Sequence, residues 1–237
     1  MFFDPVYLLF MVPALVLSLV ASAMTKSAFN RYSRQRTATG LTGAEAARLM
    51  LDRAGVRGVQ VVPTSGFLSD HYNPVTRTLA LSEEVYHRPS VAAVGVACHE
   101  AGHAIQHATS YAPLWLRSAL VPVAGIGSNL GYLIMFLGLI VMTMMNPALG
   151  VNMVLFGAVL FSAVLLFQII TLPVEFNASA RAKQLAFRYG LVADHERRGI
   201  SKVLNAAALT YVAAAVSTLM TLLYFLLRAG LLGGSDD

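Results

Sequence analysis

Two histidines and a glutamate stand close together in the string HEAGH, residues 99–103. If this segment is helical, His99 and His103 lie four residues apart on one face, where two imidazole nitrogens can bind one tetrahedral Zn²⁺. Glu100 is then placed to take a proton from a water molecule that the metal activates and to pass it to a leaving amine. The spacing predicts hydrolysis of a peptide bond. The alternative is a chance pattern on an alanine-rich helix, whose random expectation is about 0.4%.

A catalytic zinc ion normally has three protein ligands and leaves its fourth position to water. His107 continues the four-residue spacing, but it lies two turns beyond His99, roughly 12 Å along the helix axis, which is too far for a shared ion. Position 109 is Thr, so the longer motif with a third histidine six residues after the second is not met. We interpret His107 as a polar residue at the helix end or beside the substrate.

Glu175 is the better candidate for the third ligand. It is the first charged residue after Arg117, and an acid at the end of such a long apolar segment is costly unless it is paired or bound. Pro173 fits the first turn of a new helix that would carry this glutamate. The alternative is an interfacial carboxylate that pairs with Arg181 or Lys183.

The composition is that of an integral membrane protein. Hydrophobic residues make up 57% of the 237 residues and charged residues 12%, against about 25% charged in a typical soluble domain. The net charge of +5 does not indicate a nucleic-acid partner, because no DNA- or RNA-binding motif is visible and membrane topology explains the basic residues. We expect no nucleic acid. The single cysteine, Cys98, cannot form an internal disulfide, and we interpret it as a packing residue.

Four segments without Asp, Glu, Lys or Arg are long enough to cross a bilayer, which takes about 20 residues. They are residues 6–25, 118–145, 148–173 and 203–227. A cleavable signal peptide is the rival interpretation of the first segment, but its basic cluster follows the apolar run instead of preceding it. All Lys and Arg residues except one fall within 26–117 and 175–202. Because positive loops stay in the cytosol, we expect both of these parts there and both termini outside.

The first cytosolic part should contain a small sheet ahead of the motif helix. Apolar residues at helical spacing predict a short amphipathic helix that begins after Thr42 and stops at Gly55. Residues 59–63 and 76–82 have the character of strands, and residues 70–76 carry the Asn-Pro signal of a turn between them. We divide the chain into a membrane helix at 1–25, a cytosolic part at 26–117, two membrane helices in 118–174, a cytosolic part at 175–202 and a last membrane helix with a short tail at 203–237.

These residues resemble a known family, the membrane-bound neutral zinc metallopeptidases of the YugP type. The resemblance runs through residues 66–108 and 172–185, extends more loosely to the segment 40–51 and the hydrophobic segments, and covers most of the chain. It implies an α-helical membrane protein with four transmembrane helices plus a small cytosolic α+β zincin-like domain. It also implies one Zn²⁺ per chain, protein or peptide substrates, and the cytoplasmic membrane of a bacterium.

More distantly, the chain is similar to the HtpX and CAAX-type membrane proteases. These are gluzincins whose third ligand is a Glu in the pattern Glu-aromatic-x-Ala-Asp, and the equivalent string here is EFNAS, residues 175–179. The similarity implies that Glu175 completes the site with His99 and His103. Ser179 departs from the pattern, because that group has an Asp there to orient a zinc-bound histidine. The contact that fixes this imidazole must come from elsewhere or be weaker.

The YugP resemblance also marks a turn at Asp70, His71 and Tyr72 as characteristic. A His or Tyr beside the zinc could stabilise the oxyanion of the tetrahedral intermediate. The alternative is that Asp70 and Asn73 only build the turn through hydrogen bonds from side chain to backbone. His195 is a weaker candidate for the oxyanion task. By analogy with gluzincins, the strand around 78–81 would be the edge strand to which an extended substrate adds.

We therefore expect a membrane-embedded zinc endopeptidase that acts on membrane-associated or misfolded proteins at the cytosolic surface of the bilayer. The alternative is a non-catalytic scaffold or regulatory protein with a structural or vestigial zinc, which the intact Glu100 disfavours, because a structural site needs no base. A site-2-type protease would need an Asp in a later membrane helix, and a transporter would need intramembrane charges. Glycines within 118–145 permit close helix packing, and the sequence leaves open a homo-oligomer or a regulatory membrane partner.

Overall fold

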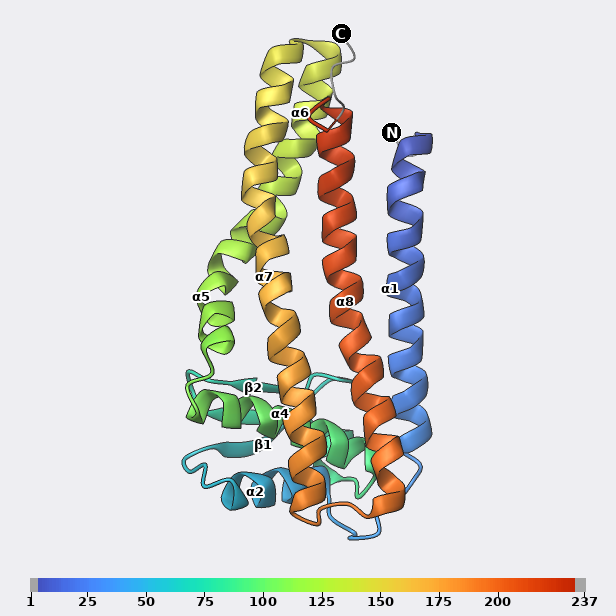
Figure 1. Ribbon diagram of the computed structural model, residues 1–237, viewed down its shortest axis with the longest axis vertical. Helices are drawn as coiled ribbons and strands as arrows, with labels where there is room; N and C mark the ends of the chain where they lie inside the picture. Colours follow the sequence, from blue (N-terminus) through green and yellow to red (C-terminus); the bar gives the residue numbers. More distant parts are fainter. Residues whose placement is uncertain (1–3, 233–237) are drawn as a thin grey trace. The chain divides into compact units, whose positions relative to one another are not determined.

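The structure, a computed structural model, describes residues 4–232. Its elements are α1 (Pro5–Tyr32), α2 (Gly43–Arg53), β1 (Gln60–Thr64), β2 (His71–Asn73), β3 (Thr78–Ser82), α3 (Glu83–His87), α4 (Val91–Ala108), α5 (Ala112–Ile126), η1 (Gly127–Gly131), α6 (Tyr132–Met144), α7 (Pro147–Arg188), η2 (Asp194–Glu196) and α8 (Arg197–Arg228), as Figure 1 shows. Residues 233–237 of the tail that we placed outside the membrane lie beyond the described residues.

Four helical stretches are long and apolar enough to cross a membrane, which confirms the four predicted spans. They are Pro5–Tyr32, Ala112–Met144, Pro147–Arg188 and Asp194–Arg228. The helices are longer than the charge-free segments, because they continue into basic residues such as Arg31 in the last turn of α1. The depth of each helix in the bilayer and the side that faces the cytosol stay predictions.

One continuous helix, α7, carries Pro173 in its interior. We predicted that this proline begins a new helix, and that prediction was wrong. Proline removes one N–H donor and crowds the preceding turn, but membrane helices tolerate this where small adjustments satisfy the freed carbonyl group. Glu175 therefore projects from the same helix that supplies the predicted third span.

The chain forms two compact units by its internal contacts, and each is described by itself. The first comprises residues 1–20, 116–171 and 211–237, and the second comprises residues 21–115 and 172–210. In the first unit α6 and its preceding turn lie against α7. A Cβ atom on Gly138 would be 2.8 Å from the backbone nitrogen of Val154, and one on Gly131 would be 2.9 Å from that of Phe161. These two glycines make the close helix packing that we expected of them, and they make it within the chain.

The second unit contains a three-stranded sheet with the order β1-β3-β2. β1 is parallel to β3, with Val61 opposite Leu79, and β2 is antiparallel to β3, with Tyr72 opposite Leu79. Two expectations were therefore wrong. His71 and Tyr72 lie in a strand and not in a turn, and the strand around 78–81 is central, so it offers no free edge. β2 was missed because its three residues, the last of which is the Asn of the Asn-Pro pair, show no hydrophobic alternation.

Two local predictions are confirmed in atomic detail. Asn73 builds the turn after β2, because its Oδ1 accepts hydrogen bonds from the backbone N–H groups of Val75 at 2.9 Å and Thr76 at 3.2 Å. Thr42 caps α2 in a capping box with Glu45, in which each side chain accepts from the other residue's backbone N–H. Asp70 has no part in this turn and bonds to β3 instead.

Small residues on α4, the helix with the HEAGH motif, let it lie in close contact with its neighbours. A Cβ atom on Gly43 of α2 would be 3.0 Å from the carbonyl oxygen of Ala93 in α4. On the α7 side, a Cβ atom on Gly102 would be 2.8 Å from the carbonyl oxygen of Ala178. Figure 1 shows α4 against the part of α7 that belongs to this unit. Backbone contact of this kind fixes the distance between the two helices.

We predict that Gly102→Ala forces α4 and α7 apart and lowers the stability of the protein by roughly 1–3 kcal/mol. Gly95→Ala is the matched control in the same helix, because its Cβ atom would meet the flexible side chain of Ile200 at an ordinary 3.5 Å. Both changes gain helix propensity, so only the contact differs. Apparent Tm in detergent should fall for Gly102→Ala and hold or rise for Gly95→Ala; equal Tm values for the two variants would contradict the prediction.

Candidate metal centre

The three predicted metal ligands come together in the second unit. His99 Nε2 lies 3.1 Å and His103 Nε2 lies 3.4 Å from the same carboxylate oxygen, Glu175 Oε2. One possible ligand atom from each residue lies within 4.8 Å of the others. All three side chains are shielded from solvent, with Glu175 only 1% exposed. α4 thus supplies two donors and α7 supplies the third.

These distances fit a tetrahedral zinc ion. Zinc binds His nitrogen and carboxylate oxygen at about 2.0–2.1 Å, so neighbouring ligand atoms in a tetrahedron are about 3.3–3.4 Å apart. The two observed His–Glu separations of 3.1 and 3.4 Å match this spacing, and all three ligand atoms lie within 4.8 Å of one another. Two imidazole nitrogens and one carboxylate oxygen are also the donor types of a three-ligand catalytic site.

A buried glutamine, Gln106, determines which nitrogen of His103 carries a hydrogen. Gln106 Nε2 donates to the carbonyl oxygen of Val174 at 2.8 Å and to Asn177 Oδ1 at 3.0 Å. The side-chain Oε1 must therefore be the atom that faces His103 Nδ1, at 3.0 Å, and it can only accept. Arg181 Nε donates to the same Asn177 oxygen at 2.8 Å, which fixes that amide in turn. His103 Nδ1 must therefore carry the hydrogen and donate a hydrogen bond to Gln106 Oε1.

This arrangement calls for a cation between His103 and Glu175. If neutral His103 holds its hydrogen on Nδ1, its Nε2 is a lone pair that faces a carboxylate oxygen, and two acceptors repel. A proton or a metal ion between them removes the conflict. Burial alone would lower the pKa of His103, but the hydrogen bond to Glu175 and the nearby carboxylates, including that of Glu100, raise its pKa overall. In the absence of metal the site therefore favours a proton.

The other ligand histidine is held by Ser179. Its Oγ lies 3.1 Å from His99 Nδ1, and the residue is buried. Ser179 thus makes the contact expected of an Asp at this position, with a neutral hydroxyl group in place of a charge. This resolves the departure noted in the sequence. The alternative pairings for Glu175 do not form, because Arg181 bonds to Asn177 and Lys183 bonds to Asn205.

Glu100 is buried beside the first ligand, as its place on α4 predicts. Asp70 lies within electrostatic reach of it. Burial raises the pKa of Asp70, hydrogen bonds from the Ser82 N–H and hydroxyl oppose this, and the Glu100 carboxylate raises it further. Asp70 therefore ties the start of β2 to the end of β3 next to the candidate base.

The remaining candidate residues lie in different surroundings, some buried and some exposed. Tyr72 shares a 2.8 Å hydrogen bond with His107 Nδ1, in the last turn of α4. His71 is exposed, with Nδ1 near the backbone oxygen of Ser69. His195 is exposed in η2, and among the described residues it makes no contact with the three clustered ligands. Cys98 is buried in the core, and burial raises the pKa of its thiol to about 12.

Gln106 and Asn177 were not identified from the sequence. Gln106 lies three residues after His103, so helical spacing already puts both on one face. That spacing was a usable signal. Asn177 could not have been paired with Gln106 without knowing how α4 and α7 meet.

The amino-acid sequence of the chain matches that of a zinc metallopeptidase family. A family model described as "Putative neutral zinc metallopeptidase" matches residues 7–230, so the chain belongs to this family. It is also 45% identical over 226 residues to the "Putative membrane protease YugP" of Bacillus subtilis (strain 168), an alignment that covers 95% of this chain and 96% of the relative. No solved structure matches the chain.

Removal of the Gln106 amide should loosen the metal site. We expect Gln106→Leu to weaken zinc binding about 10–100-fold, because His103 loses the acceptor that fixes its ring and tautomer. Gln184→Leu, on an exposed position of α7, is the control and should bind zinc as the wild type does. Competition of each purified protein with a fluorescent zinc chelator measures the affinity. Unchanged zinc affinity in Gln106→Leu would show that the glutamine does not position the ligand.

Proposed function

We propose that the protein is a membrane endopeptidase in which His99, His103 and Glu175 hold one Zn²⁺ and Glu100 is the general base. The observation that carries this proposal is the single oxygen of Glu175 within 3.1–3.4 Å of both histidine Nε2 atoms. The ring of each histidine is independently held, by Ser179 and by Gln106. Such a preorganised donor set is expected where a metal must keep one geometry through a reaction.

Zinc at this site would supply Lewis-acid chemistry, because it polarises the scissile carbonyl group and makes water a nucleophile near neutral pH. Glu100 would take a proton from the attacking water and deliver it to the leaving amine as the C–N bond breaks. The carboxylate is thereby ionised again at the end of each turnover. Its burial next to His99 keeps bulk water from competing for this proton.

Tyr72 is a stronger oxyanion candidate than His71. Its hydroxyl group is held by His107 on the motif helix, whereas His71 is exposed and bonds to local backbone. A phenol positioned beside the substrate carbonyl could stabilise the charge that develops on its oxygen.

The substrate strand would add to β2 and not to β3. β3 is paired on both sides, while β2 forms an edge of the sheet. An extended peptide can bind such an edge through main-chain hydrogen bonds. β2 also carries Tyr72, so this placement would bring the peptide past the candidate oxyanion residue.

The substrates that fit this arrangement are membrane-associated or misfolded proteins at the cytosolic surface of a bacterial membrane. Glu175 lies on α7, one of the four helices able to span a membrane, so the bilayer would deliver substrates to the site. The cytosolic orientation is supported by the concentration of Lys and Arg in residues 26–117 and 175–202. A scaffold with a structural zinc is disfavoured, since three ligands leave a position open.

The test compares zinc content and cleavage of unfolded casein for the wild type, Glu100→Gln, His103→Ala and Glu175→Ala. We expect one zinc per chain in the wild type and in Glu100→Gln, with cleavage reduced about 10²–10⁴-fold in the latter. His103→Ala and Glu175→Ala should lose both zinc and activity. Glu83→Gln, at an exposed site, is the control and should keep both. Full activity in Glu100→Gln, or full zinc content in Glu175→Ala, would refute the assignment.

A further inference from the structure

A shallow groove with a volume of about 590 Å³ lies along the C-terminal part of α1, within the second unit. Its walls are formed by Ala23, Lys26, Ser27, Asn30, Arg31 and Arg34. The first five of these positions share one face of α1, and Arg34 follows in the turn after the helix ends at Tyr32. Three of the six side chains are cationic, two are neutral hydrogen-bonding groups and none is acidic. The groove is therefore strongly positive.

The three cations are not neutralised within the part of the chain that the structure describes. Lys26, Arg31 and Arg34 are exposed, and no carboxylate among the described residues forms an ion pair with them. Arg31 only lies over the ring of Tyr32, at 5.7 Å. Like charges repel, and an anion that binds between the three cations would relieve the repulsion.

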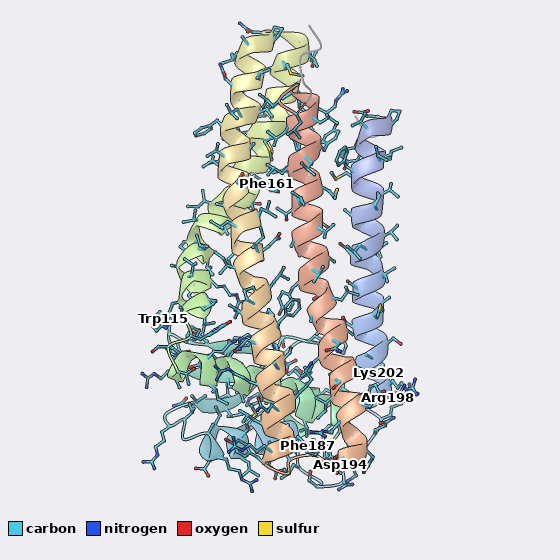
Figure 2. All side chains as sticks on the ribbon, viewed as in Figure 1. Trp115, Phe161, Phe187, Asp194, Arg198 and Lys202 are labelled. Carbon is cyan, nitrogen blue, oxygen red and sulfur yellow. The ribbon has the colours of Figure 1, made fainter. Side chains whose placement is uncertain are left out.

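The first turns of α8 carry two more cations, but these turns pack against the side of α1 that faces away from the groove. Thr25 of α1 donates a hydrogen bond to the carbonyl oxygen of Ala206 at 2.9 Å, so these parts of the two helices lie side by side. Figure 2 shows Arg198 and Lys202 on this part of α8, next to the C-terminal end of α1. The positive charge of the groove therefore comes from Lys26, Arg31 and Arg34.

We propose that this groove binds the headgroup of an anionic phospholipid. α1 is one of the four helices able to span a membrane, and the exposed apolar side chain of Met24 lies beside the groove on the same helix. Acyl chains would lie along this apolar surface while the phosphate meets the cations. Each Lys or Arg near an anionic bilayer contributes about fivefold to binding. A nucleic acid is less suited, because the groove has no aromatic side chain on which bases could stack.

The test is native mass spectrometry of the full-length protein in detergent, titrated with dioleoyl phosphatidylglycerol or dioleoyl phosphatidylcholine. We expect the wild type to bind phosphatidylglycerol at least about tenfold more tightly than phosphatidylcholine. The triple variant Lys26→Gln, Arg31→Gln, Arg34→Gln should lose this preference. The triple variant Arg57→Gln, Arg88→Gln, Arg188→Gln removes the same charge from exposed positions outside the groove and should retain it.

Two outcomes would overturn the proposal. One is equal affinity of the wild type for the two lipids, a result that does not depend on any variant folding. The other is an equal loss of preference in both triple variants, which would show a general charge effect and no site. Asn30→Asp adds one negative charge to the groove and should weaken phosphatidylglycerol binding without loss of zinc; an unchanged affinity would also count against the site. Lipid binding is measured without peptidase activity, so these experiments test the lipid site independently of the proposed function.

Discussion

The close approach of α4 and α7 at Gly102 and Ala178 is the constraint on which the candidate metal centre depends. A side chain larger than hydrogen at position 102 would meet the backbone of α7. With the two backbones in contact, Glu175 reaches the Nε2 atoms of both histidines on the facing side of α4. A distance set by backbone contact is stiff, which suits a site whose donors must keep their positions to within a fraction of an ångström.

Burial of the polar groups in this interface costs free energy, and a connected network of hydrogen bonds satisfies these groups. Glu175, Ser179 and Gln106 are all buried, and an unpaired group of this kind would cost several kcal/mol. The hydrogen bonds from Arg181 through Asn177 and Gln106 end at His103 Nδ1 and leave its Nε2 lone pair towards the carboxylate. The interface is therefore complete only when a cation lies between the ligands.

Much of the site could be predicted because its signals are local. The HEAGH spacing needs only helix geometry, and Glu175 stands out as an acid after a long uncharged segment. The predictions that failed concerned features that depend on tertiary structure. Pro173 obeys the usual rule for a helix start, yet the helix around it continues. The three residues of β2 have no strand pattern of their own and become a strand only by pairing with β3. The similarity to the HtpX and CAAX-type proteases placed Ser179 where an Asp orients a zinc-bound histidine, but that its neutral hydroxyl group makes this contact follows only from the way α7 meets His99.

The most direct test of the proposed coordination is X-ray absorption spectroscopy at the zinc edge of the zinc-loaded, full-length protein. His99, His103 and Glu175 predict four nitrogen or oxygen neighbours at about 2.0–2.1 Å, with the outer-shell signal of two imidazole rings. A sulfur neighbour at about 2.3 Å would place Cys98 in the site, and three imidazole rings would replace Glu175 with another histidine. Either spectrum would contradict the site described above.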